Sequence, residues 1–246
     1  MLSNDTAGNY RFIPSSSGVP FCDGVVADTG YEIVRATLDR PLPYRAGFDL
    51  IERHLASLGR PRQALCALEL RCAGQYESRD AFQAFNADYA ALLTSWGKFD
   101  DATGVGSTTR TNIAPLYDPP AEQVLFAFAY TIPSAIGRPT FVISGATTRD
   151  GEDSPEAVRE KAANILDVLG SRLAALDLAW DLATDTFVYA PGSPEAILDE
   201  TALDKLGATI RNGVRWFPGL APVVGSRLEI GAQGLLQELR IPDGKL

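Results

Sequence analysis

Apolar residues recur at spacings of three and four in several stretches of the chain, which predicts amphipathic helices. Such stripes lie at about 45–58, 82–92 and 158–176. The third of these helices is expected to open with Ser154 as its N-cap, because a proline follows at the first helical position. A second Ser-Pro pair predicts a fourth helix over about 193–213.

Runs rich in β-branched and aromatic residues alternate with these helices and predict strands. Each half of the chain then reads strand, helix, strand, helix, strand, strand. A weak internal repeat supports this order, because the segment 53–71 can be laid over 171–189 without a gap so that the main apolar positions coincide. We therefore predict an α/β fold of two tandem βαβαββ domains, residues 1–135 and 136–246, that assemble through their sheet faces.

The composition is that of a globular chain, with 246 residues of which 46% are apolar. The chain has no apolar run of about eighteen residues, and its first ten residues lack the basic and apolar regions of a signal peptide. We therefore expect a cytoplasmic protein that does not enter a membrane. The cysteines Cys22, Cys66 and Cys72 show no metal-ligand spacing and are predicted to be small core residues.

Charge and residue inventory exclude several kinds of chemistry. The net charge of −9 discourages binding to nucleic acid or anionic membranes, although a small carboxylate still fits as a partner. The only histidine, His54, flanks the apolar stripe of the first predicted helix, so neither a zinc site nor a His-dependent triad has support. Dinucleotide-binding and P-loop patterns are missing as well. The sequence thus predicts no metal and no cofactor.

Several stretches resemble one known family. The second helix "AFQAFNADYAALL", the strand "TRTNIAP" and the run "VISGATT" that opens the second half, in this order of elements, resemble the YjgF/Rid family, the reactive intermediate deaminases. The resemblance covers nearly the whole chain as two copies in tandem. In addition, "GYEIVRATL", "PRQALCALELR" and "RTNIAPLYDPPAE" are similar to a subgroup of that family, the 2-aminomuconate and 2-amino-5-chloromuconate deaminases.

The resemblance implies trimers with clefts at domain interfaces. In the family, an arginine grips the carboxylate of an imine or enamine, and Arg110 matches this arginine. Asn86 and Tyr89 match the Asn-x-x-Tyr of the helix beside the cleft. Ser144 and Gly145 match a Ser-Gly pair that lines the cleft from a neighbouring domain.

The acidic residue of the family lies on the last strand, where it matches Glu229 of the second half. The first half has Leu125 or a neighbour at this position. If arginine and acid must come from one domain, the second half depends on Arg215, whose alignment requires a shift of one residue. An acid within the apolar pattern "RLEIGA" is costly unless it is paired or functional, so an ion pair with Arg227 is the alternative role for Glu229.

These matches imply a metal-independent hydrolytic deaminase that releases ammonia from an enamine or imine carboxylate such as 2-aminomuconate and leaves a 2-oxo acid. Arg110 would hold the carboxylate through two parallel hydrogen bonds. Glu229 is the first candidate for proton transfer, and Tyr89, Tyr117 and Asp118 are further ones. Tyr89 also fits a packing role, and Asp118 also fits a turn before two prolines.

A muconate carries a carboxylate at each end, so a second cation would improve its selection. Arg35, Arg149 and Arg215 are candidates, with a solvated surface position as the alternative for each. Two other functions stay open at this point. One is a non-catalytic Rid-like module that binds a small acid, and the other is a chorismatase-like hydrolase. A homotrimer is expected, because a chain of two Rid-like domains leaves apolar sheet surface uncovered.

Overall fold

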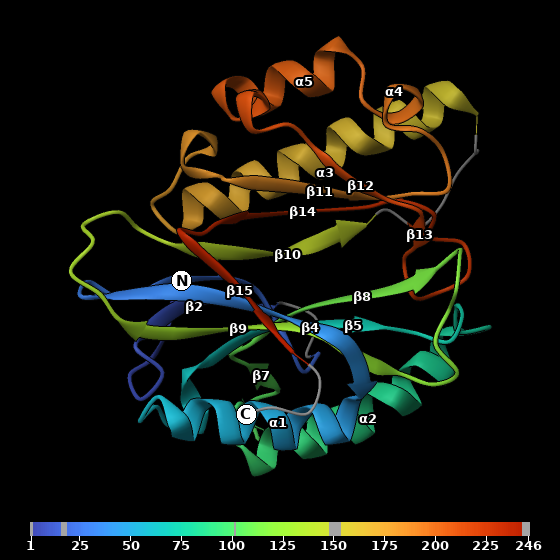
Figure 1. Ribbon diagram of the computed structural model, residues 1–246. Coiled ribbons are helices and arrows are strands. Elements are labelled where there is room, and N and C mark those ends of the chain that lie inside the picture. Colours follow the sequence, from blue (N-terminus) through green and yellow to red (C-terminus); the bar gives the residue numbers. More distant parts are fainter. Residues whose placement is uncertain (1, 16–18, 101, 148–153, 243–246) are drawn as a thin grey trace.

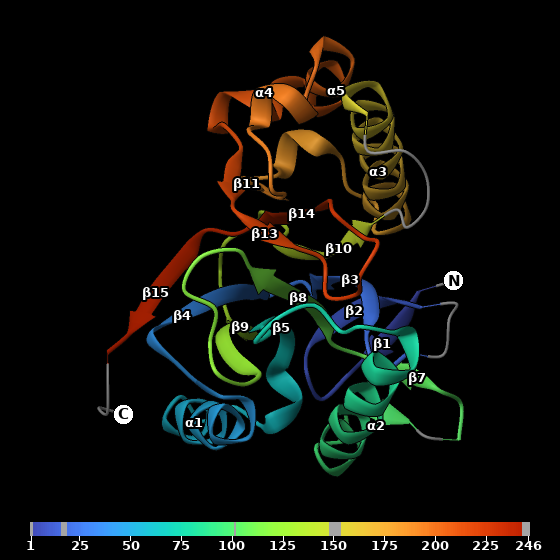
Figure 2. The ribbon, with the colours of Figure 1, turned by 90° about the vertical axis from the view of Figure 1, so that its right-hand side faces the viewer.

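The chain stacks its secondary structure in four layers, with helices on the outside and two sheets face to face between them (Figure 1). The structure, a computed structural model, describes residues 2–15, 19–100, 102–147 and 154–242. In the turned view of Figure 2 the two helical layers again lie on opposite sides of the paired sheets.

The first half has the predicted order of elements. These are β4 (Tyr31–Pro43), α1 (Tyr44–Ser57), β5 (Leu65–Arg71), α2 (Arg79–Ser95), β8 (Thr109–Pro115) and β9 (Val124–Pro133). A short hairpin, β6 (Phe99–Asp100) and β7 (Val105–Gly106), follows α2. The buried stripes of α1 and α2 pack on one face of the sheet, where Phe48 and Ile51 share a core with Tyr89 and Leu93.

The second half repeats this order. Its elements are β10 (Phe141–Thr147), α3 (Pro155–Ala175), β11 (Asp185–Tyr189), α4 (Pro194–Ile197), α5 (Glu200–Leu206), β12 (Arg215–Phe217) and β14 (Glu229–Gly234). Ser154 caps α3 as predicted, because its side chain accepts a hydrogen bond from the backbone of Ala157. The α/β fold of two tandem βαβαββ units is confirmed.

The single helix predicted over 193–213 is wrong. The segment instead forms α4, α5 and a 3₁₀ turn at Gly207–Asn212. Asp199 starts a new helix because its carboxylate accepts a hydrogen bond from the backbone N–H of Ala202 at 3.0 Å. Gly207 ends that helix with a φ of 55°, a conformation that favours glycine.

Strands from each end of the chain cross to the sheet of the other half. The N-terminal strands β1 (Ser3–Asp5), β2 (Tyr10–Pro14) and β3 (Cys22–Ala27) extend the seven-stranded sheet, whose order is β1-β2-β3-β10-β14-β11-β12. In return, β13 (Gly219–Leu220) and β15 (Gln237–Ile241) flank the six-stranded sheet, in the order β13-β8-β5-β9-β4-β15. The predicted boundary at 135/136 falls between β9 and β10, which belong to different sheets, and it stays a prediction because both halves contribute to both sheets.

The inner faces of the two sheets cover each other. Small apolar side chains fill much of the space between them, including Ala27 of β3, Cys66 and Ala67 of β5 and Ala129 of β9. Small side chains allow sheets to approach closely. Each half therefore buries its sheet face against the other half of the same chain, so a trimer does not follow from uncovered sheet faces. All three cysteines are buried and free, as predicted.

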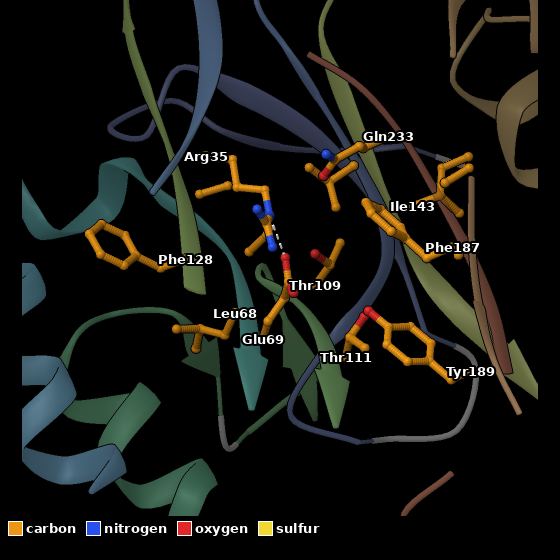
Figure 3. Close-up of a pocket in the computed structure, with 15 residues that line it drawn as sticks. Arg35, Leu68, Glu69, Thr109, Thr111, Phe128, Ile143, Phe187, Tyr189 and Gln233 are labelled. Carbon is orange, nitrogen blue, oxygen red and sulfur yellow. Dashed lines mark hydrogen bonds and ion pairs between the residues drawn. The ribbon is translucent and has the colours of Figure 1, made fainter. Parts of the chain in front are cut away.

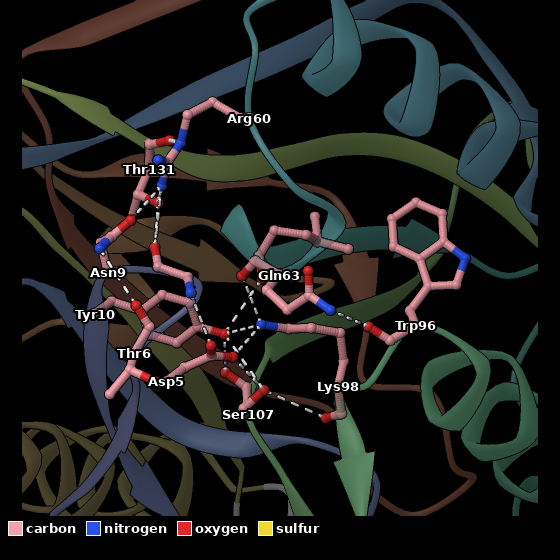
Figure 4. Close-up of polar contacts among 12 residues, drawn as sticks. Asp5, Thr6, Asn9, Tyr10, Arg60, Gln63, Trp96, Lys98, Ser107 and Thr131 are labelled. Atoms are coloured by element: carbon pink, nitrogen blue, oxygen red, sulfur yellow. Dashed lines mark hydrogen bonds and ion pairs between the residues drawn. The ribbon is translucent and has the colours of Figure 1, made fainter.

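A buried lysine ties the N-terminal hairpin to the first half (Figure 4). Lys98 donates to Asp5 Oδ2 at 2.6 Å, to the Gln63 carbonyl at 2.8 Å and to the hydroxyl of Tyr10. Burial lowers the pKa of Lys98, and the negative charge of Asp5 opposes that shift. Because a buried charge is tolerated only with such partners, this contact fixes β1 and β2 against the neighbouring sheet.

The prediction that His54 lies beside the apolar stripe of its helix, outside the core, is wrong. His54 lies on the buried face of α1, edge-on to the rings of Phe128 at 5.5 Å and Tyr130 at 4.9 Å. Burial lowers its pKa, which favours the neutral ring. The histidine is therefore part of the apolar core, because a neutral imidazole can pack against aromatic rings.

Candidate active site

Arg110 lies on β8 with its side chain buried against the aromatic face of α2. Its guanidinium carbon is 4.7 Å from the ring centre of Tyr89, 5.4 Å from Phe82, 5.6 Å from Phe85 and 4.7 Å from Phe21. The α2 residues share one helical face because they are three and four positions apart. Aromatic faces attract a cation, so these rings stabilise the buried charge of Arg110.

Two asparagines on the same elements as Arg110 and its aromatic neighbours have buried polar atoms. Asn86 shares the helical face of Phe82 and Tyr89, and within the described part of the chain neither its Nδ2 nor its Oδ1 has a hydrogen-bond partner. Asn112 is two residues from Arg110 on β8, hence on the same face, and its Nδ2 likewise has no partner among the described residues. Unpartnered buried amides cost about 1 to 3 kcal/mol each, so they indicate a ligand or water site.

A chain of hydrogen bonds leads from Asn112 through Gln123 to Tyr76. Asn112 Oδ1 accepts from Gln123 Nε2 at 2.7 Å and from Cys72 Sγ at 2.9 Å. Gln123 Oε1 in turn accepts from the hydroxyl of Tyr76 at 3.1 Å. The ring of Tyr76 lies 5.9 Å from that of Phe85, so these hydrogen bonds link Asn112 to the aromatic residues around Arg110.

Glu229 approaches Arg110 from the other half of the molecule. It is the first residue of β14, is 6% exposed, and has Thr147 of β10 and Tyr189 of β11 as its cross-strand neighbours. Burial raises the pKa of Glu229 to about 8, and the charges of Arg71, Arg110 and Arg172 oppose that shift. The charge of Arg110 in the first half thus acts on the acid of the second half.

Gly145 makes room for that carboxyl group. A Cβ atom at this position would lie 2.1 Å from Glu229 Oε1 and 2.7 Å from its Cγ. The register of β10 against β14 shifts between Ile143 and Ala146, as in a β-bulge, which brings Gly145 under the acid. Gly145 therefore supports Glu229. Ser144 belongs to β10, and its side chain lies outside the described residues.

Comparison with known proteins shows the family of this chain. The family model described as "2-aminomuconate deaminase CnbZ" matches residues 2–239. The chain belongs to this family. A 2-amino-5-chloromuconate deaminase from Comamonas testosteroni is 33% identical over 94% of this chain and 95% of its own length. The family resemblance seen in the sequence is confirmed.

Solved structures with some likeness to this family member were also found. A chorismatase aligns with 86% of this chain and 77% of its own length, at 13% identity and a TM-score of 0.45. A putative endoribonuclease L-PSP from Entamoeba histolytica covers 43% of this chain and 84% of its own length, at 14% identity and a TM-score of 0.33. Rv2704 of Mycobacterium tuberculosis, from the YjgF/YER057c/UK114 family, covers 43% of this chain and 83% of its own length, at 16% identity and a TM-score of 0.27.

Two further arginines, Arg71 and Arg172, oppose the raised pKa of Glu229 and were not expected from the sequence. Arg71 ends β5 and places its guanidinium 4.2 Å from the ring centre of Phe126 and 5.6 Å from that of Tyr189. Arg172 lies on α3 and pairs with Asp23 at 3.1 Å. No local motif marks either residue, because each reaches the site only through the stacking of the two sheets.

Arg35 and Arg215 are engaged in ion pairs away from the Arg110 pocket. Arg35 donates to Glu69 at 2.6 Å (Figure 3). Arg215 is half-exposed and pairs with Asp185 at 2.8 Å and with Glu238 at 3.7 Å. The cavity in Figure 3 that Arg35 and Glu69 line between the sheets has a volume of about 20 Å³, which is room for a water molecule and not for a muconate.

The other predicted site residues lie elsewhere or apart from the pocket. Tyr117 is 74% exposed and Asp118 has a φ of 48°, which fits its alternative role in a turn. Arg227 is exposed, whereas Glu229 is buried. Leu125 packs in the core beneath α1. Arg149 lies outside the described residues.

Within the described ranges, no three His, Cys, Asp or Glu side chains come together as metal ligands. No helix in these ranges is both long enough and apolar enough to cross a membrane.

Proposed function

We propose that this chain hydrolyses an enamine or imine carboxylate of the 2-aminomuconate class, releasing ammonia and a 2-oxo acid. The observation that supports this most directly is the charge of Arg110 acting on the buried carboxyl group of Glu229 across the two halves, together with the unpartnered amide of Asn86 and the unused Nδ2 of Asn112. A planar guanidinium suits a carboxylate. A buried acid beside it suits proton transfer.

The reaction needs a positioned water and proton transfers. The enamine takes a proton on carbon and becomes an iminium, whose C2 is electrophilic. Water forms a C–O bond at C2, and one of its protons passes to the nitrogen. The C–N bond then breaks, ammonia leaves, and loss of the hydroxyl proton gives the C=O bond. Nothing is oxidised or reduced, so the protein supplies orientation and acid–base groups.

Glu229 fits the role of proton donor. Because its pKa is raised to about 8, most of it is protonated in neutral solution. It can therefore give a proton to the enamine carbon and then, as a carboxylate, accept one from water. Tyr89 is the other buried candidate for proton transfer. Burial raises its pKa above the ordinary value of a tyrosine, although the charge of Arg110 opposes this shift. This favours a packing and binding role for the phenol.

Arg71 is proposed to meet the second carboxylate of a muconate. Its pairing with Glu69 is loose, at 3.5 Å, whereas Arg35 holds the same carboxylate at 2.6 Å. Arg71 is also the first of the cations that oppose the raised pKa of Glu229. An arginine on each side of the acid would select a dicarboxylate over the imine of an ordinary amino acid.

We further propose a homotrimer that works in the cytoplasm without a metal. The assembly has support in exposed apolar residues, namely Leu116 and Tyr117 after β8, Trp216 in β12 and Val224 after β13. Native mass spectrometry should give three times the chain mass. A stable monomer at micromolar concentration would contradict the trimer, and activity lost to a chelator and restored by one divalent metal would contradict metal independence.

The function is tested by offering freshly generated 2-aminomuconate to the purified chain and following ammonia release. We expect turnover with stoichiometric ammonia. Chorismate should be left unchanged, and pyruvate formation from it would instead favour a chorismatase-like hydrolase. Saturable binding of 2-aminomuconate without ammonia release would favour a non-catalytic binding module.

A further inference from the structure

Asn112 carries a buried hydrogen-bond donor that no described residue uses. The side chain is 4% exposed, and it lies on the same face of β8 as Arg110. Its Oδ1 already accepts from Gln123 Nε2 and from Cys72 Sγ. These two donors fix the orientation of the amide, because the reverse orientation would set Nδ2 against the Gln123 amide nitrogen. The Nδ2 group is therefore held in a fixed direction.

The groups behind Asn112 make that direction rigid. Gln123 is held at its side chain by the Tyr76 hydroxyl and at its carbonyl by the backbone N–H of Tyr44 at 3.1 Å. Tyr76 packs against Phe82 at 5.3 Å, and Phe82 is one of the rings beneath Arg110. One polar chain thus positions the Asn112 donor relative to the guanidinium.

A donor that lies beside a buried cation selects an anionic acceptor. We infer that Asn112 is a specificity-determining residue that donates from Nδ2 to a carboxylate oxygen of the substrate, next to the carboxylate site of Arg110. The inference rests on the proposed function for the identity of the substrate. Its own content is carboxylate recognition by this amide, which can be measured without turnover.

Asn112→Asp isolates the unused donor. An aspartate keeps an oxygen that accepts from Gln123 and Cys72, but it replaces Nδ2 by a second acceptor that repels an anion. We expect the Kd for cis,cis-muconate, a dicarboxylate without the amino group, and the KM for 2-aminomuconate to rise roughly 10- to 100-fold. The Tm should change little, and Asn4→Asp, the same change at an exposed position of β1, should leave all three values unchanged.

Asn112→Ser is the second variant, because a hydroxyl can still accept from Gln123 but is too short to reach a ligand. It should weaken muconate binding without adding charge. A well-folded Asn112→Asp or Asn112→Ser chain that binds muconate and 2-aminomuconate as the wild type does would overturn the inference while leaving the deaminase proposal intact. A wild-type chain that binds muconate through Asn112 but releases no ammonia would instead remove the deaminase proposal and leave the inference standing.

Discussion

Arg110 on β8 and Arg215 on β12 occupy corresponding strands of the two halves, but their surroundings differ. Arg110 is 6% exposed and lies among four aromatic rings. The side chain of Arg215 is 48% exposed and is paired with Asp185 and Glu238. Of the two arginines, only Arg110 lies near buried side-chain amide groups that have no hydrogen-bond partner among the described residues. The charge of Arg110 is thus surrounded by aromatic rings, whereas that of Arg215 is paired with carboxylates of the protein.

The two arginines differ because Arg215 lies one residue further along its strand than Arg110 does in the internal repeat. Arg110 lies opposite Leu68 of β5, whereas Arg215 lies opposite Phe187 of β11. The internal repeat places Phe187 on Glu69, whose partner on β8 is Thr111. Arg215 therefore corresponds to Thr111. Since successive residues of a strand point to opposite faces, Arg110 faces the helix α2 and Arg215 faces the space between the sheets.

The comparison also explains why the first half needs no acid of its own. The stacking of the two sheets within one chain puts Glu229 of the second half where the charge of Arg110 acts on it. We propose that this arginine and this acid, which the sequence divides between two domains, form one site. We therefore expect one working site per chain, and the variants below test this from the largest expected effect to the smallest.

Arg110→Ala should have the largest effect. Loss of a buried charge-assisted carboxylate contact costs about 2 to 5 kcal/mol, which lowers kcat/KM by roughly 1.5 to 3.7 decades. Arg110→Lys should fall well below the wild type too, because it keeps the charge but loses the planar fork. Deamination rate and Tm are measured together. Near-normal turnover in a folded Arg110→Ala chain would remove Arg110 from the mechanism, and a parallel loss of Tm and activity would indicate a purely structural arginine.

Glu229→Gln should lower kcat by roughly 100-fold at neutral pH, since an amide cannot transfer the proton. The wild-type rate should decline as pH rises through about 8, where Glu229 loses its proton, and the variant should lack that decline. The measurement is the pH–rate profile of the wild type and of Glu229→Gln. An identical alkaline limb in the two profiles would assign the proton donor to another group.

The same carboxyl group should affect stability. Its pKa of about 8 in the folded chain lies above the ordinary 4.5, so folding takes up a proton between these values. The resulting stabilisation is complete below about pH 4.5 and is lost as pH rises through about 8, at up to about 1.4 kcal/mol per pH unit. Denaturant unfolding of wild type and Glu229→Gln across this window should show the slope in the wild type alone.

Gly145→Ala should have an intermediate effect. The added Cβ would displace the Glu229 carboxyl group, and a misplaced catalytic group commonly costs roughly 10- to 100-fold in kcat. KM should change less than kcat, because Arg110 is untouched. Gly137→Ala, where a Cβ meets nothing within 4 Å, is the matched control. Equal kinetics for the two variants would show that the close approach of Gly145 to Glu229 has no catalytic role.

The spacing of apolar residues was sufficient to predict the helices and strands that depend on a local pattern. The stripes of α1, α2 and α3 and the strands between them follow from spacing alone, and the family motif led directly to Arg110. The break in the helix predicted over 193–213 could have been predicted, because Asp199 is a typical N-cap residue and Gly207 a typical helix end. The position of His54 was missed because one polar ring on a helix flank has no distinctive spacing.

The composition of the site could not be obtained in the same way. Glu229, Arg71 and Arg172 come together only when the two sheets stack, and no spacing along the chain encodes that distance. The exchange of β3 and β15 between sheets has the same origin, because a strand's pattern does not specify its partner when both sheets offer a suitable edge. Asn112 was visible in the family motif, but its unused donor appears only in the packed structure.

Arg215→Ala should have the smallest effect, and it is the most direct way to break the comparison. Because the guanidinium is half-exposed and paired with Asp185 and Glu238, its loss should lower stability by about 1 kcal/mol or less. The kcat/KM for 2-aminomuconate should stay within about twofold of the wild type, as expected for a substitution that leaves the transition state untouched. The measurement is steady-state kinetics of Arg215→Ala beside Arg110→Ala. A loss comparable to that of Arg110→Ala would mean that Arg215 in the second half also binds substrate. The shift of Arg215 by one residue relative to Arg110 would then have placed a second site between the sheets.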